Sequence, residues 1–81
     1  MMIEVQLFAR ARDLAGVPRL TVSLPAGATV GDLRHRLGEL VPNLARLLER
    51  SALAVDSEWA DDAVPLASGS EVALLPPVSG G

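Results

Sequence analysis

Polar and apolar residues alternate in two stretches near the start of the chain, and this pattern predicts two β-strands. In residues 2–8 the side chains of Ile3, Val5 and Leu7 share one face, and in residues 19–24 every second residue is again apolar. A period of two is that of a strand with one buried face. Residues 9–15 between them have helical spacing, so they form either one helical turn or a structured loop. We therefore expect a hairpin with a long connection.

The longest helical pattern begins at Thr29. Its hydroxyl can cap the helix, and Asp32 three residues later completes a start that resembles a capping box. Pro42 ends the helix at or before residue 41. A single apolar stripe runs along this helix: Val30, Leu33, Leu37, Leu40 and Val41. A second, short helical stretch is expected over residues 43–50.

The second half of the chain predicts two more strands, at residues 51–55 and 71–75, separated by a turn at residues 56–58 and a loop at residues 61–70. The first and last strands are the most continuously apolar, so we expect them in the sheet centre, side by side and parallel. One main helix on one face of a mixed sheet is an α+β architecture, and this order is that of a β-grasp (ubiquitin-like) domain. We assign residues 1–75 to this domain and residues 76–81 to a flexible C-terminal Gly-Gly tail.

Composition narrows the class of protein. The chain has 81 residues, of which 49% are hydrophobic, so a single domain with a packed core is expected. Cysteine is absent, which excludes disulfides, thiolate metal sites and cysteine nucleophiles. The start has no signal-peptide pattern, and no apolar run approaches the roughly 20 residues that span a bilayer. We expect a soluble, cytoplasmic protein without a membrane partner.

Charge is divided unevenly along the chain. The first fifty residues hold all seven arginines and five acids, a net +2, whereas residues 51–81 hold five acids and no base, a net −5. An acidic C-terminal third argues against nucleic acid as a ligand. It is compatible with docking on a basic protein surface, and equally with a solvated acidic face.

Side-chain chemistry offers no catalytic or metal-binding cluster. His35, the only histidine, lies roughly opposite the apolar stripe, and no cysteine or tyrosine is available to complete a nucleophilic set. Asp61 and Asp62 are too few to hold a metal. Trp59 either packs at the sheet rim or anchors an interface. We predict no metal and no bound cofactor.

The end of the chain carries the strongest functional signal. The apolar run of residues 72–75 reads as a buried strand, and Pro76 and Pro77 bar any continuation as a helix or central strand. The six residues 76–81 can extend roughly 20 Å beyond that strand. Gly80 and Gly81 lack side chains, so they can enter a narrow channel in another protein. We expect the carboxylate of Gly81 to be the functional group and the domain to be its handle.

Three segments together resemble one family over nearly the whole chain. They are LFARARDLAG at residues 7–16, PAGATV at residues 25–30 and, most specifically, EVALLPPVSGG at residues 71–81. On these segments the chain resembles the small subunits of molybdopterin synthase, which are ubiquitin-like sulfur carriers. The family commonly has Val-Asn where this chain has Val55 and Asp56, and an aspartate preserves the turn-forming chemistry there.

The resemblance implies a route for sulfur through the tail. A ubiquitin-activating-type adenylyltransferase would use ATP to adenylate Gly81, and a sulfur donor protein would convert it to a thiocarboxylate. The tail (Pro76, Pro77, Val78, Ser79, Gly80) would then enter the large subunit of the synthase, in an assembly of two small and two large subunits. There the sulfur would pass to cyclic pyranopterin monophosphate. Three residues are candidates for a partner surface, although each could instead belong to the core: Phe8, Leu66 and Leu74.

Three alternatives stay open at this point. A carrier of the same fold could supply sulfur for thiamin thiazole or for tRNA thiolation. A ubiquitin-like modifier would link Gly81 to lysines of target proteins. A plain interaction module would carry its Gly-Gly end incidentally.

Overall fold

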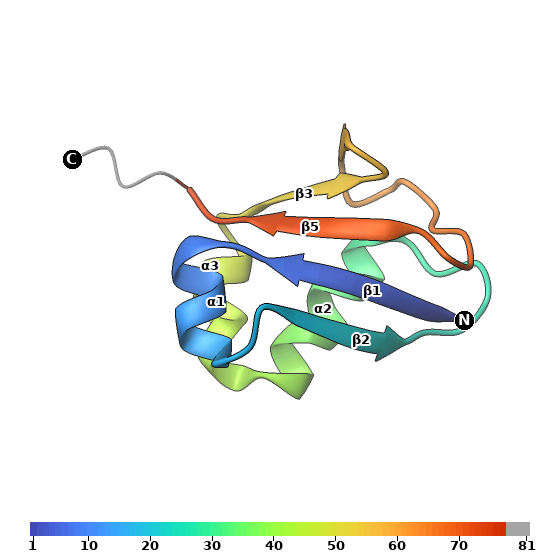
Figure 1. Ribbon diagram of the computed structural model, residues 1–81. Coiled ribbons are helices and arrows are strands. Elements are labelled where there is room, and N and C mark those ends of the chain that lie inside the picture. Colours follow the sequence, from blue (N-terminus) through green and yellow to red (C-terminus); the bar gives the residue numbers. More distant parts are fainter. Residues whose placement is uncertain (78–81) are drawn as a thin grey trace.

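The first and last strands of the protein lie side by side and parallel, as expected, in a computed structural model that describes residues 1–77 (Figure 1). They are β1 (Met2–Leu7) and β5 (Glu71–Leu75). The other strands are β2 (Arg19–Ser23), β3 (Ala52–Val55) and β4 (Glu58–Ala60), and they complete a five-stranded sheet of order β2-β1-β5-β3-β4. All pairings except β1 with β5 are antiparallel. The predicted mixed sheet is confirmed.

Helices cover one face of this sheet, and the main one begins where the sequence predicts. They are α1 (Ala9–Ala15), α2 (Val30–Leu40), the 3-10 turn η1 (Pro42–Leu44) and α3 (Ala45–Leu48). The hydroxyl of Thr29 accepts a hydrogen bond from the Asp32 N–H (3.2 Å), and the Asp32 carboxylate accepts one from the Thr29 N–H (2.9 Å). These two reciprocal bonds form a capping box, which fixes the first turn of α2.

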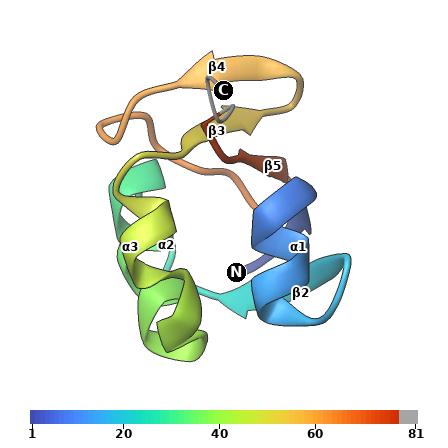
Figure 2. The same ribbon diagram turned by 90° about the vertical axis from the view of Figure 1, so that its left-hand side faces the viewer.

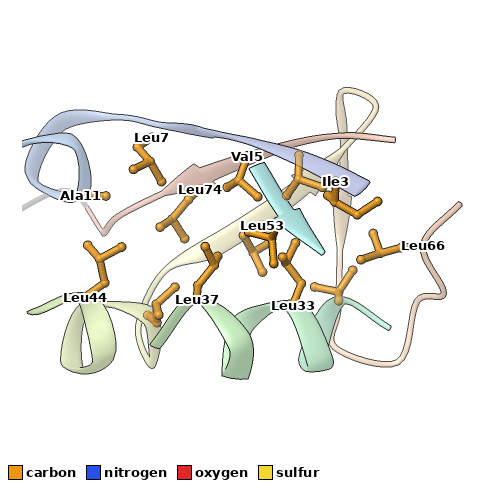
Figure 3. Packing of buried hydrophobic residues seen from close by; sticks show 14 of the residues in the cluster. Ile3, Val5, Leu7, Ala11, Leu33, Leu37, Leu44, Leu53, Leu66 and Leu74 are labelled. Atoms are coloured by element: carbon orange, nitrogen blue, oxygen red, sulfur yellow. The ribbon is translucent and has the colours of Figure 1, made fainter. Parts of the chain in front are cut away.

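The core lies between α2 and the inner face of the sheet (Figure 3). Leu33 and Leu37 of α2 are fully buried and Val41 packs against the core, but Leu40 is 46% exposed and leaves the predicted stripe. Leu44 of η1 is fully buried instead, because the chain turns back over the core after Pro42. Each fully buried leucine contributes roughly 1.5–3 kcal/mol to folding. The sheet supplies the opposing side chains: Ile3, Val5, Leu7, Val22, Leu53, Val72 and Leu74.

The short edge strand β4 was not predicted from the sequence. A two-residue turn joins it to β3, and both turn residues have positive φ, 49° at Asp56 and 72° at Ser57. Such a turn matches the twist of a hairpin, although glycine or asparagine is the usual occupant. The Asp56 carboxylate accepts a hydrogen bond from the Glu71 N–H (3.0 Å), and the Asp56 N–H donates to the Glu71 carbonyl (2.8 Å). These bonds hold the hairpin against the start of β5.

Candidate functional site: the open face of the sheet and the base of the tail

The last strand carries the chain to one end of the sheet. Since β5 runs parallel to β1, with Leu74 in register with Leu7, both strands end at the same edge of the sheet, near α1 (Figure 1). Pro76 is partly buried and Pro77 is exposed. The remaining predicted tail residues lie outside the described part of the chain, and their roles stay predictions: Val78, Ser79, Gly80 and Gly81.

Phe8 lies at this same end, directly after β1. Its backbone is extended (φ −120°, ψ 152°) and the residue is 42% exposed. Because Leu7 points into the core and side chains alternate along an extended chain, Phe8 points to the opposite face. Ala9 follows with a φ of +50°, so the backbone turns sharply away into α1 there. Phe8 is thus an exposed aromatic side chain beside the base of the tail, and its role in a partner surface stays a prediction.

The face of the sheet that points away from α2 carries an apolar surface. Ala54 of β3 is paired with Trp59 of β4 on one side and with Ala73 of β5 on the other, so the three share this face. Ala52 is paired with Leu75 one step closer to the tail. Trp59 is 72% exposed. We call the following set the open-face patch: Phe8, Ala52, Ala54, Trp59, Ala73 and Leu75.

A hollow and an acidic border adjoin the open-face patch. The hollow has a volume of about 110 Å³ and is lined by Gln6, Ala54, Ser57 and Ala73 among others, which is room for one inserted side chain. Asp56, Glu58 and Glu71, which surround the β3–β4 turn, are exposed carboxylates. A wide aromatic side chain beside a hollow and a charged border is the pattern of a protein-binding surface.

Two of the three residues predicted for a partner surface belong to the core, which corrects that prediction. Leu74 is 0% and Leu66 is 6% exposed. Strand alternation points Leu74 inward and its neighbour Leu75 outward, and the Leu66 N–H donates to the Ala28 carbonyl (2.9 Å), which holds the loop against the segment that precedes α2. Trp59 and Leu75 are instead the larger side chains of β4 and β5 on the open face. For Trp59, the interface alternative fits its exposure better than packing at the rim.

The other polar candidates are dispersed. His35 is exposed on α2, with Nε2 4.0 Å from the Glu39 carboxylate. The Asp61 carboxylate accepts the Ala63 N–H (2.9 Å), and the Asp62 carboxylate accepts Nε of Arg34 (3.0 Å), so each has a structural partner. Within residues 1–77 no three His, Cys, Asp or Glu side chains converge on a point that could hold a metal ion. None of the helices in this part of the chain is long and apolar enough to cross a bilayer.

Comparison with known proteins gives consistent matches over nearly the whole chain. The sequence model of the ThiS family matches residues 5–81. The molybdopterin synthase sulfur carrier subunit of Arabidopsis thaliana is 39% identical over 79 residues, which cover 98% of this chain and 82% of the relative.

Solved structures share the fold. The crystal structure of SAMP1 from Haloferax volcanii superposes with a TM-score of 0.89 at 32% identity, and 100% of each chain is covered. A chain from the complex of subunits 1 and 2 of the molybdopterin-converting factor of Helicobacter pylori 26695 gives a TM-score of 0.72 at 27% identity, again with 100% of each chain covered. The predicted β-grasp fold is confirmed.

Proposed function

The chain belongs to the ThiS family, and we propose that it is the sulfur carrier subunit of a molybdopterin synthase. The observation that carries the proposal is its similarity, over nearly its full length, to a relative of that name. The similarity to a chain of a two-subunit molybdopterin-converting factor supports a large-subunit partner. The exposed apolar surface of the described residues suits a protein that docks on a partner.

The proposed chemistry takes place at the carboxylate of Gly81. A carboxylate is a poor electrophile, so an adenylyltransferase would first activate it: a carboxylate oxygen attacks the α-phosphate of ATP and pyrophosphate leaves. A sulfide nucleophile supplied by a donor protein then attacks the carbonyl carbon, and AMP leaves with the electrons of the broken C–O bond. The product is a thiocarboxylate, whose sulfur is nucleophilic. ATP belongs to the activating enzyme, and we place the reaction in the cytoplasm.

Docking would place this sulfur in the partner's active site. The open-face patch extends to the end of the sheet where β5 ends, and Leu75 and Phe8 are its residues at that end. A large subunit that covers the patch would therefore receive the six residues of the tail, which reach roughly 20 Å. There two transfers to cyclic pyranopterin monophosphate would build molybdopterin, in an assembly of two small and two large subunits.

A reconstituted reaction tests the proposal. Thiocarboxylated carrier, purified large subunit and cyclic pyranopterin monophosphate should yield molybdopterin. A variant that lacks Gly81 should yield none, while its thermal unfolding matches that of the wild type because the tail lies beyond the core strand. A deletion variant that does not fold would contradict the hypothesis that Gly81 serves the chemistry and not the stability of the domain. Activity with thiazole or tRNA acceptors alone would assign the carrier to a different product.

A second candidate function is protein modification. In a second crystal structure the Haloferax volcanii protein is named a small archaeal modifier protein, and the match covers 95% of this chain and 98% of that protein. A modifier would transfer the activated carbonyl of Gly81 to a lysine amine of a target. Isopeptide-linked Gly-Gly remnants on cellular proteins, lost on deletion of Gly81, would favour this alternative.

A further inference from the structure

A second surface lies on the helical side of the molecule, where α2 and α3 lie next to each other (Figure 2). A groove of about 430 Å³ runs between them. Its apolar lining, which we call its floor, includes Gly38, Ala45 and Leu48, and the exposed residues Glu39 and Glu49, which we call its rim, also line it. We call it the α2–α3 groove. The open-face patch points away from these helices, so the two surfaces are separate.

Gly38 is not explained by the packing of this chain. A methyl group at this position would lie 3.7 Å from Leu48 Cδ1 and 3.8 Å from the Ala45 Cβ, which are ordinary contact distances. Gly31, in the first turn of the same helix, differs because a methyl group there would lie 3.1 Å from the Asp62 Cβ. Glycine inside a helix costs roughly 0.5–1 kcal/mol relative to alanine. The glycine at residue 38 leaves the floor of the groove open, although the packing of the fold does not require a glycine there.

The charge at the rim is negative. The guanidinium of Arg34 lies at the groove but is already engaged: it donates to the carbonyls of Leu48 and Ser51 and pairs with the Asp62 carboxylate. Glu39 is paired weakly, 3.5 Å from Arg36 and 4.0 Å from His35.

Glu49 makes no ion pair with any residue between 1 and 77. An apolar floor with carboxylates above it complements a side chain that has an aliphatic stem and a cationic head. Lysine and arginine are the side chains of that kind.

We propose that the α2–α3 groove binds a lysine or arginine side chain, with apolar neighbours, from a second protein. The stem lies over Gly38 and Leu48, and the head meets the carboxylates of Glu39 and Glu49. A protein bound in the groove leaves the open-face patch uncovered. The second protein therefore binds the carrier while the large subunit occupies the patch. The inference does not depend on what the tail carries.

Nuclear magnetic resonance with a defined peptide tests the groove. The probe is acetyl-Leu-Arg-Leu-amide, titrated into the ¹⁵N-labelled chain, with acetyl-Leu-Glu-Leu-amide as the matched peptide of opposite charge. We expect saturable shifts of the Gly38, Ala45 and Leu48 amides with the arginine peptide, and none at Trp59. The glutamate peptide should give no saturable shift.

Variants of the chain complete the test. Glu39→Gln and Glu49→Gln should each weaken arginine-peptide binding about two- to fivefold, since exposed ion pairs contribute modestly. Glu58→Gln removes the same charge from β4, outside the groove, and should leave the affinity unchanged. Gly38→Ala should raise the unfolding temperature and still weaken binding. Shifts centred on Trp59, equal binding of both peptides, or an affinity that none of the groove variants changes would overturn the proposal.

Discussion

Trp59 is the largest side chain of the open-face patch. Replacing it with alanine should weaken docking strongly while the domain still folds. Aromatic side chains bury about 150–250 Å² when fully covered, so a residue that is 72% exposed offers about 110–180 Å² to a partner. At about 25 cal/mol per Å² this area corresponds to about 3–4.5 kcal/mol. Part of it is offset by the ordering of side chains, so we expect a loss of about 2–3 kcal/mol in binding.

The assay is isothermal titration calorimetry with the purified large subunit. Trp59→Ala should raise Kd about 30- to 150-fold, whereas the free energy of unfolding should fall by only about 1–2 kcal/mol, because the buried remainder of the residue is about 40–70 Å². Leu40→Ala is the matched control: Leu40 is 46% exposed at the end of α2, away from the patch. Its Kd should stay within about twofold of the wild type. A Trp59→Ala variant that binds as tightly as Leu40→Ala would refute the assignment of the patch.

Three further predictions concern the fold and are read by urea denaturation. Leu74→Ala should destabilise the protein by about 2–5 kcal/mol, because the residue is fully buried in the central strand; a cost below about 1 kcal/mol would place it on the surface after all. Thr29→Ala should cost about 0.5–2 kcal/mol through loss of the capping box, and an unchanged midpoint would contradict that role. Ser57→Gly should raise stability by up to about 1 kcal/mol, since its φ of 72° suits glycine; destabilisation would show that the side chain is needed there.

Most of the fold could be predicted from the sequence, because the local signals and the hydrophobic pattern both agree with it. Thr29 and Asp32 marked the start of α2 through two hydrogen bonds that span only three residues. Pro42 marked its end. The alternation of apolar residues in β1 identified its buried face without ambiguity.

The residues that the sequence could not place lie where the pattern holds no such information. In residues 72–75 every side chain is apolar, so a period of two cannot be read, and Leu74 stayed open between the core and a partner surface. The strand β4 has three residues and exists because it pairs with β3 across a turn of Asp56 and Ser57, which lacks the usual glycine. Trp59 could therefore not be placed on a face.

Long-range contacts could likewise not be predicted from the sequence. Arg34 connects α2 to the carbonyls of Leu48 and Ser51 and to Asp62, 28 residues further along the chain. No motif marks such an arginine, because its partners are brought together by the fold alone. The α2–α3 groove depends on the same assembly of distant elements.

The intact mass of the chain after reaction tests the central claim most directly. The purified protein is incubated with ATP, a sulfide source and the host's activating enzyme, beside a variant that lacks Gly81. The account predicts a mass gain equal to the exchange of one oxygen for one sulfur in the wild type and no gain in the variant. An unchanged wild-type mass, with an enzyme shown to be active on another carrier, would contradict the sulfur carrier role.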